Sequence, residues 1–188
     1  MNPPKSPQRK AVFLDRDGTI NRDTGYLHRI EDLEIFPWAY EAIRKLNQAD
    51  YLVVVVTNQS GIARSMYNLA DVHKLHAEID RRLAENDARI DCYYICPHHP
   101  DADHKDYGVA CDCRKGQPGM LLQAAIDLGI DLKGSFMIGD KQSDVEAGQR
   151  AGCTVIQLAE KHTLGKLTFP NILDASNYIL EMRKVDEA

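Results

Sequence analysis

The sequence predicts an α/β protein: a doubly wound parallel sheet of the Rossmann-like kind, with helices on both faces. Short apolar runs of strand length alternate along the chain with stretches whose apolar residues follow helical spacing. Several of these runs end abruptly in polar residues, as strands do when their carboxyl ends carry a site. The chain has no internal repeat, no low-complexity tract and no linker long enough to divide it.

The elements follow in order. Strands are predicted at residues 10–15, 51–56, 91–95, 135–138 and 154–158, and the valine-rich second run is expected at the centre of the sheet. Helices are predicted at 37–48, at 69–83 with Asn68 as N-cap, at 120–128 closed by Gly129, and at 143–151. Residues 21–36 form a loop, and 172–184 hold a strand fragment and a last helix. Trp38 is expected in the core.

Composition limits the class of protein. At 188 residues the chain suits one domain, here 10–188, after a disordered lead-in at 1–9 that is not a signal peptide. A net charge of −5 argues against a nucleic-acid partner, and no apolar run is long enough to span a membrane. Five cysteines in a chain of this size favour reduced or metal-bound thiols in the cytoplasm. We expect a monomer.

Three predicted strands end in residues suited to phosphoryl transfer. Asp15 and Asp17 follow the first strand, Thr57 ends the second, and Asp140 follows the fourth. Close carboxylates repel and call for a cation, which indicates a Mg²⁺ site at Asp15, Asp17 and Asp140, with Asp144 behind them. Asp15 would attack phosphorus and Asp17 would act as acid and base, while Thr57 and Lys115 would hold the phosphoryl oxygens.

The polar loop at 96–116 carries a second predicted metal site. Cys96 and His98 form one pair, and Cys111 and Cys113 form another. Three sulfurs and one imidazole suit tetrahedral Zn²⁺ with no open position, so the zinc would be structural and would set the position of Arg114 and Lys115, which directly follow Cys113. His99 or His104 could replace His98. Cys92 and Cys153 are expected in the core.

These motifs, in this order, resemble the haloacid dehalogenase-like superfamily. The matching residues are Asp-x-Asp-x-Thr at 15–19, Thr57 after the valine-rich strand, Lys115, and Gly-Asp-x-x-x-Asp at 139–144. The resemblance implies a phosphatase that forms an aspartyl-phosphate. Larger members insert a cap domain over the site, but the intervals available here are too short for one, so we expect an open site.

Within that superfamily, the sequence resembles the D-glycero-D-manno-heptose 1,7-bisphosphate 7-phosphatases most specifically. The segments that carry this resemblance are 14–21, 57–64, 96–100, 111–115 and 118–121. That likeness implies removal of the 7-phosphate in nucleotide-activated heptose biosynthesis, for lipopolysaccharide core or a related glycan. It implies substrate contacts at Asp23, Thr24, Gly25, Tyr26, Thr57, Asn58, Gln59, Ser60, Arg114, Lys115 and Lys141. The family usually continues Arg-Lys-Pro, whereas Gly116 stands here and should loosen the backbone next to Lys115.

Other functions stay open from the sequence. Histidinol-phosphate phosphatases share the zinc-loop, cap-free plan and act in histidine biosynthesis. An inactive zinc-stapled binding module would need neither the acids nor the lysine, all of which are present. A nucleic-acid 3′-phosphatase fits poorly with the acidic composition.

Overall fold

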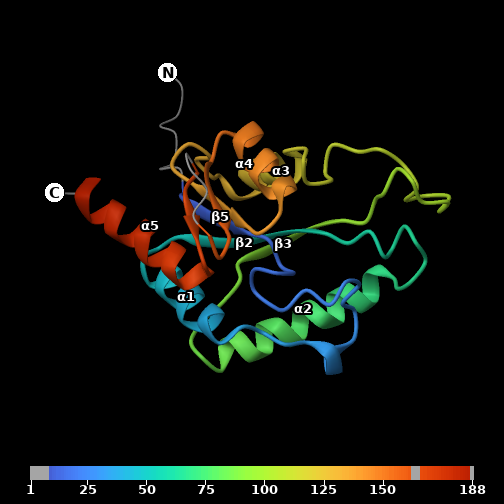
Figure 1. The fold of residues 1–188 in the computed structure, drawn as a ribbon, viewed down its shortest axis with the longest axis horizontal. Helices are drawn as coiled ribbons and strands as arrows, with labels where there is room; N and C mark the ends of the chain where they lie inside the picture. The colour runs from blue at the N-terminus through green and yellow to red at the C-terminus, as the bar shows by residue number, and fades with distance from the viewer. Residues whose placement is uncertain (1–8, 162–165, 187–188) are drawn as a thin grey trace, which may run out of the picture.

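A parallel sheet of six strands forms the centre of the molecule in the computed structural model, which describes residues 9–161 and 166–186 (Figure 1). The strand order is β3-β2-β1-β4-β5-β6, and every neighbouring pair is parallel. The strands are β1 (Ala11–Leu14), β2 (Leu52–Asn58), β3 (Cys92–Cys96), β4 (Phe136–Gly139), β5 (Thr154–Leu158) and β6 (Thr168–Phe169). Strands β2 and β3 are added on one side of β1, and β4, β5 and β6 on the other, so the strand order changes direction between β1 and β4. In folds of this kind, ligands bind beyond the carboxyl ends of the strands at this point.

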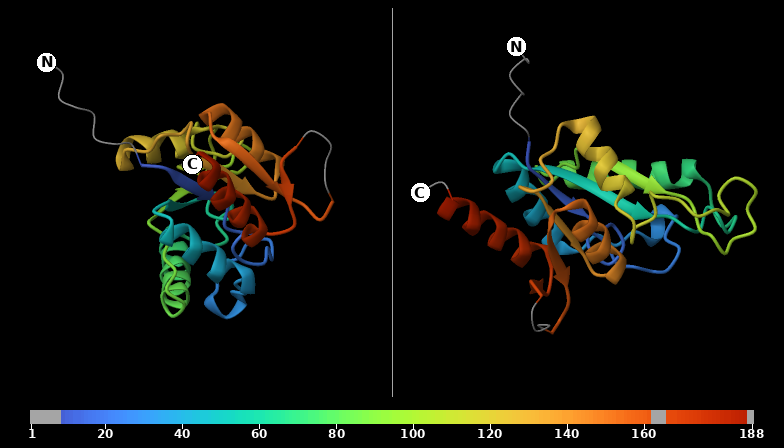
Figure 2. Two further views of the ribbon diagram at one scale, coloured as in Figure 1. Left: turned by 90° about the vertical axis from the view of Figure 1, so that its left-hand side faces the viewer. Right: turned by 90° about the horizontal axis from the view of Figure 1, so that it is seen from above.

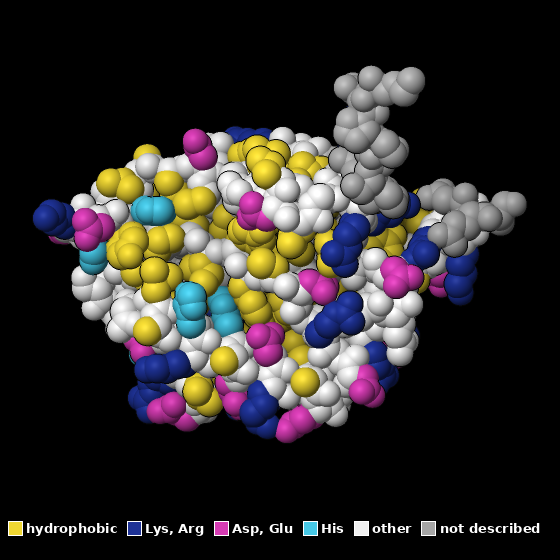
Figure 3. Space-filling model, turned by 180° about the vertical axis from the view of Figure 1, so that it is seen from behind, with side chains coloured by type: hydrophobic (Ala, Val, Ile, Leu, Met, Phe, Trp, Pro, Cys, Tyr) yellow, Lys and Arg dark blue, Asp and Glu magenta, His cyan; other side chains and the backbone are white. Residues whose placement is uncertain are grey.

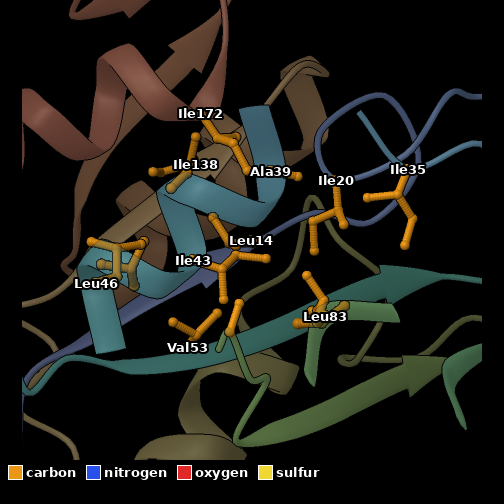
Figure 4. Close-up of a cluster of buried hydrophobic side chains, with 14 of the residues drawn as sticks. Leu14, Ile20, Ile35, Ala39, Ile43, Leu46, Val53, Leu83, Ile138 and Ile172 are labelled. Atoms are coloured by element: carbon orange, nitrogen blue, oxygen red, sulfur yellow. The ribbon is translucent and has the colours of Figure 1, made fainter. Parts of the chain in front are cut away.

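Helices cover both faces of this sheet. Helices α1 (Pro37–Gln48), α2 (Leu69–Ala84) and α5 (Ile172–Asp186) pack on one face, and α3 (Gly119–Leu128) and α4 (Gln142–Ala151) on the other (Figure 2). Alternate residues of β1 serve the two layers: Leu14 packs with Ile43 of α1 (Figure 4), whereas Phe13 packs with Leu121 of α3. The doubly wound architecture predicted from the sequence is confirmed.

Local signals place the helix ends as predicted. The side chain of Asn68 accepts a hydrogen bond from the backbone N–H of Asp71, whose carboxylate accepts one from Asn68 in return, so α2 begins with a capping box. Gly129 ends α3 in the left-handed conformation (φ 66°), which glycine adopts without steric cost.

Three details differ from the sequence-based expectation. Arg9 is not part of a disordered lead-in, because its backbone pairs with Ile130 in a parallel bridge; residues 1–8 lie outside the described part. The last strand fragment lies at Thr168–Phe169, before the 172–184 segment, which is helical. Trp38 is 37% exposed and stacks on Phe36, with 4.9 Å between ring centroids, because it lies on the outer side of α1.

The long connections gather at one edge of the sheet. The segments after β1, β2 and β3 leave from the carboxyl ends of the strands, and the loop that begins at Cys96 projects furthest (yellow-green in Figure 1), whereas α5 lies at the other end. Between β1 and β2 the chain forms only the short 3-10 helix η1 (Ile30–Asp32) and α1, and between β2 and β3 only α2. These intervals contain no separate cap domain. None of the helices in 9–161 or 166–186 has the length and hydropathy needed to cross a bilayer.

Candidate active site

Three carboxylates meet at the carboxyl edge of the sheet. Asp15 follows β1, Asp140 follows β4, and Asp144 lies in the first turn of α4; each offers an oxygen within 4.8 Å of the others. Two glycines make this approach possible. A Cβ on Gly18 would lie 2.5 Å from Asp140 Oδ2, and one on Gly139 would lie 2.3 Å from Asp144 Oδ2, so neither position has room for a side chain.

The buried ammonium of Lys115 pairs with two of these acids. Its Nζ donates to Asp15 Oδ1 and lies 2.8 Å from Asp144 Oδ1, and the residue is only 6% exposed. Burial alone would lower the pKa of Lys115, but attraction to the two carboxylates outweighs burial and raises it. The lysine is therefore a permanent positive charge beside Asp15.

The backbone of Lys115 is also held. Its N–H donates to Asn58 Oδ1 at 2.9 Å, so the end of β2 fixes the lysine directly. Gly116 has φ 97°, a conformation closed to proline, and its N–H donates to Ser143 O at 3.0 Å. Hydrogen bonds from the backbone N–H groups of both Lys115 and Gly116 hold this peptide, and the expectation that Gly116 loosens it stays a prediction.

The charge of the cluster leaves room for a divalent cation. When all three carboxylates are ionised, they and the one ammonium leave two negative charges, which a single Mg²⁺ would balance. Burial raises the pKa of Asp15 to about 7, against the opposing attraction of Lys115, so an added cation would favour the ionised nucleophile. Asp140 Oδ1 is buried and has no hydrogen-bond partner among the described residues, as expected for an oxygen that a metal would occupy. Oxygen donors of this kind are those Mg²⁺ prefers.

The carboxylate of Asp17 does not join this group. It accepts hydrogen bonds from Arg16 (2.8 and 3.1 Å), from Asn21 Nδ2 (2.9 Å) and from Gln59 Nε2 (3.1 Å). Both oxygens therefore already have hydrogen-bond donors within the protein. The described carboxylates that could share a metal, with oxygens within 4.8 Å of one another, are those of Asp15, Asp140 and Asp144, so the geometry does not match the prediction that the Asp17 carboxylate joins them.

Thr57 and Gln59 lie at the end of β2 and after it. Thr57 Oγ1 accepts a hydrogen bond from Gln59 Nε2 at 2.8 Å, which leaves the hydroxyl hydrogen available for an incoming oxygen. Gln59 is only 2% exposed, and its Oε1 accepts from Tyr67 OH at 2.8 Å. Gln59 thus links Thr57 to Asp17, and its predicted contact with substrate stays a prediction.

The rim of the site carries the other predicted substrate residues. Lys141 Nζ donates to Asp23 Oδ2 at 2.8 Å, an ion pair that joins the loop after β1 to the start of α4. Thr24, Gly25 and Tyr26 are exposed beside it. Ser60 is half-buried next to the buried Gln59. The structure thus exposes Asp23 to Tyr26 and Lys141 for contact with a ligand.

The second predicted metal site is assembled. The thiols of Cys96, Cys111 and Cys113 lie 3.2–3.6 Å from one another, and His98 Nδ1 lies 3.3 Å from Cys113 Sγ and 3.7 Å from Cys96 Sγ. In a tetrahedral Zn²⁺ site, bonds of about 2.3 Å to sulfur and about 2.0 Å to nitrogen place two sulfurs about 3.8 Å apart and a sulfur and a nitrogen about 3.5 Å apart. The separations here are within about 0.6 Å of those values, so the four ligand atoms are already gathered as a zinc site requires.

The neighbouring histidines face other groups. His99 Nδ1 accepts from Asp101 N, and His104 Nδ1 accepts from Asp106 N. Of the three candidates, His98 alone joins the cysteines among the described residues. Arg114 NH1 donates to the carbonyl of His98 at 3.1 Å, so the loop also positions the arginine that precedes Lys115. Cys153 is buried as expected, and Cys92 is half-buried.

Sequence reasoning missed Arg16 and His76. Arg16 is fully buried and pairs with Asp17, although it stands between two predicted catalytic acids where a solvent-exposed charge is the ordinary expectation. His76 occupies an apolar position of the α2 stripe and contacts Arg16 NH1. Two features of the sequence could have indicated these residues: Arg16 is a charged residue next to the end of a buried strand, and His76 is a histidine at an apolar position of a helix.

The fold and this site define a hydrolase of the haloacid dehalogenase-like class. A family model described as HAD-hyrolase-like matches residues 112–166. The D-glycero-beta-D-manno-heptose-1,7-bisphosphate 7-phosphatase of Photorhabdus laumondii is 50% identical over 141 residues, 75% of each chain. The enzyme of that name from Escherichia coli K12 is 42% identical over 170 residues, 90% of this chain and 87% of its own.

A solved structure agrees. That of D,D-heptose 1,7-bisphosphate phosphatase from B. bronchiseptica, complexed with magnesium and phosphate, superposes with a TM-score of 0.81 at 30% identity, covering 92% of this chain and 99% of its own. The chain belongs to the heptose-1,7-bisphosphate 7-phosphatase family of haloacid dehalogenase-like phosphatases.

Proposed function

We propose that this protein removes the 7-phosphate of D-glycero-β-D-manno-heptose 1,7-bisphosphate and leaves the 1-phosphate in place, a step that would serve nucleotide-activated heptose biosynthesis. The observation that carries the proposal is the buried Asp15–Lys115–Asp144 group beside Asp140, found in a chain whose relatives bear this enzyme name at 42–50% identity. The β anomer is taken from the names of those relatives.

The proposed reaction uses Asp15 as the nucleophile. Its carboxylate attacks the 7-phosphorus, and the bond to the sugar oxygen breaks to give an aspartyl-phosphate. Asp17 gives a proton to the departing oxygen and later removes one from the attacking water. Lys115 and the hydroxyl of Thr57 would bind the phosphoryl oxygens, where positive charge and donated hydrogen bonds stabilise the transition state.

Mg²⁺ would be held by Asp15 and Asp140. Asp144 stays behind them, because one oxygen faces Lys115 and the other accepts from Lys141 N at 3.0 Å. The bound ion would shield the negative charge that Asp15 and the phosphate share. The sugar and its second phosphate would be contacted by residues at the rim of the site: Asp23, Thr24, Gly25, Tyr26, Ser60, Arg114 and Lys141. Residues 10–188 would act as one domain.

The substrate assignment is tested by a panel of phosphate esters. Values of kcat/KM for the α and β heptose bisphosphates and for histidinol phosphate should rank the β anomer first, with the product keeping phosphate on carbon 1. A higher kcat/KM for histidinol phosphate would replace this assignment with that of the neighbouring family. The surface shown in Figure 3 carries interspersed acidic and basic side chains, which does not favour a nucleic-acid substrate.

We propose Zn²⁺ as a structural ion at Cys96, His98, Cys111 and Cys113. Replacing Cys111 by serine should remove the metal, because a hydroxyl is a poor zinc ligand, and should release the loop that positions Arg114 and Lys115. Metal analysis should give about one zinc per chain for the parent protein and well under half of that for the variant.

Cys153→Ser is the matched control, since that thiol lies apart from the cluster. It should keep its zinc. Full zinc content together with unchanged thermal stability in Cys111→Ser would contradict the assignment of the loop.

A further inference from the structure

Arg16 is a charged side chain with no exposed surface. Its guanidinium donates to both oxygens of Asp17, from Nε to Oδ1 at 3.1 Å and from NH2 to Oδ2 at 2.8 Å. A planar fork that grips both oxygens of a carboxylate fixes the plane of that carboxylate as well as its position. The other two donors to Asp17, Asn21 and Gln59, offer one N–H each and fix only a distance.

The guanidinium of Arg16 is in turn held by further contacts. NH2 also donates to the carbonyl of Leu27 at 3.2 Å, and NH1 lies 3.2 Å from Nε2 of His76 on α2. The ring of His76 stacks on that of Tyr93, with centroids 4.0 Å apart and planes 16° from parallel. Tyr93 OH donates to Asp80 Oδ1 at 2.7 Å. A continuous set of contacts therefore runs from α2 and β3 to Asp17.

The contact between Arg16 and His76 has one chemical form. An arginine side chain has donors and no acceptor, so Nε2 of His76 has to accept and its imidazole has to be neutral. Burial, and then the charge of Arg16, lower the pKa of His76 to about 3. The imidazole is thus a neutral acceptor across the working pH range. Arg16 has no exposed surface and His76 is 5% exposed, and the hydrogen-bond partners of both side chains are groups inside the protein.

We propose that Arg16 and His76 form a positioning pair that holds the Asp17 carboxylate in the orientation needed to give a proton to the leaving oxygen. The proposal rests on the proposed function, in which Asp17 is the acid and base. Proton transfer depends on orientation as well as distance, and a displacement of about 1 Å can cost about 100-fold in rate. His76 lies on α2, which also packs on the sheet through Leu75, Ile79 and Leu83.

Two leaving groups separate positioning of an acid from general damage. The sugar alkoxide needs a proton as it departs, whereas p-nitrophenolate departs without one. The ratio kcat/KM reports the steps up to phosphoenzyme formation, so it records this difference. Removing His76 or Arg16 should lower kcat/KM about 10- to 100-fold for the heptose bisphosphate and less than about threefold for p-nitrophenyl phosphate, through kcat with KM nearly constant.

The variants are His76→Ala, His76→Gln and Arg16→Lys, with Asp17→Asn as the reference for a lost acid. The amide oxygen of glutamine can still accept from Arg16, so His76→Gln should recover much of the activity lost in His76→Ala. His73→Ala is the matched control, because His73 lies on the exposed side of the same helix. It should behave as the parent. Urea unfolding identifies any variant that is not folded, and the conservative replacements His76→Gln and Arg16→Lys then decide the test.

Equal losses on the two substrates in the Arg16 and His76 variants, with a clear leaving-group effect in Asp17→Asn, would overturn the positioning pair and leave the proposed function intact. Equal losses in Asp17→Asn itself would overturn the acid role of Asp17, and the proposal with it. A leaving-group effect shared by all three positions, with partial rescue in His76→Gln, is the expected result.

Discussion

Replacing Asp15 by asparagine should abolish phosphate release, with kcat reduced about 10⁴- to 10⁶-fold, the range found when a catalytic nucleophile is removed. An amide is a poor nucleophile and cannot form the aspartyl-phosphate. The change keeps the size of the side chain, and Lys115 keeps Asp144 as its ionic partner. The fold should therefore survive, and the loss should be one of chemistry. Release of phosphate from the heptose bisphosphate at saturating Mg²⁺ is the measurement.

Asp87→Asn is the control for this change, since Asp87 is exposed beyond the end of α2 and has φ 54°, which asparagine tolerates. It should release phosphate at the parent rate. Turnover of Asp15→Asn within tenfold of the parent would remove the covalent mechanism, whatever the identity of the substrate.

Replacing Lys115 by methionine should lower both stability and activity. The variant leaves Asp15 and Asp144 buried together without their cation, and removal of one partner from a buried ion pair typically costs about 3–5 kcal/mol. The transition state also loses a positive charge, for which a decrease in kcat of about 10²- to 10³-fold is expected. Urea unfolding without metal gives the first quantity, and steady-state kinetics gives the second.

Measuring the stability of both proteins with and without Mg²⁺ makes this test more specific. Because the ion would supply positive charge to the same carboxylates, adding it should recover more stability in Lys115→Met than in the parent protein. The exposed Lys105, in the zinc loop, is the control position, and Lys105→Met should unfold at the parent urea concentration. Unchanged stability of Lys115→Met in the absence of metal would mean that the buried pair does not have the charges assigned to it.

Much of the fold could be predicted from hydrophobic patterns. The valine-rich β2 and the spacing of Ala39, Ile43 and Leu46 in α1 are local signals, and the structure follows them closely. The short edge strand β6 was misplaced, since its two residues carry no pattern of their own and its position is set by pairing with β5. Trp38, at the start of α1, was expected in the core, but the orientation of its side chain is set by how α1 docks on the sheet.

The sequence indicated which residues form the site, but it did not indicate how their side chains are oriented and hydrogen-bonded. The order of Asp15, Thr57, Lys115 and Asp140 along the chain, together with parallel strands, was enough to bring these residues to one edge. The orientation of the Asp17 carboxylate could not be predicted, because it depends on the turn after β1. The partners of Arg16 also escaped prediction, since His76 is 60 positions away and joins it only through packing of α2.

Detection of the covalent intermediate tests the central claim most directly. The protein is mixed with the heptose bisphosphate and Mg²⁺, quenched in acid within the first turnover and digested, and the peptides are analysed by mass spectrometry. We expect one phosphoryl group on the peptide that contains Asp15 and none in Asp15→Asn. A phosphoryl group on another residue, or steady turnover with the Asp15 peptide unmodified at every quench time, would contradict it.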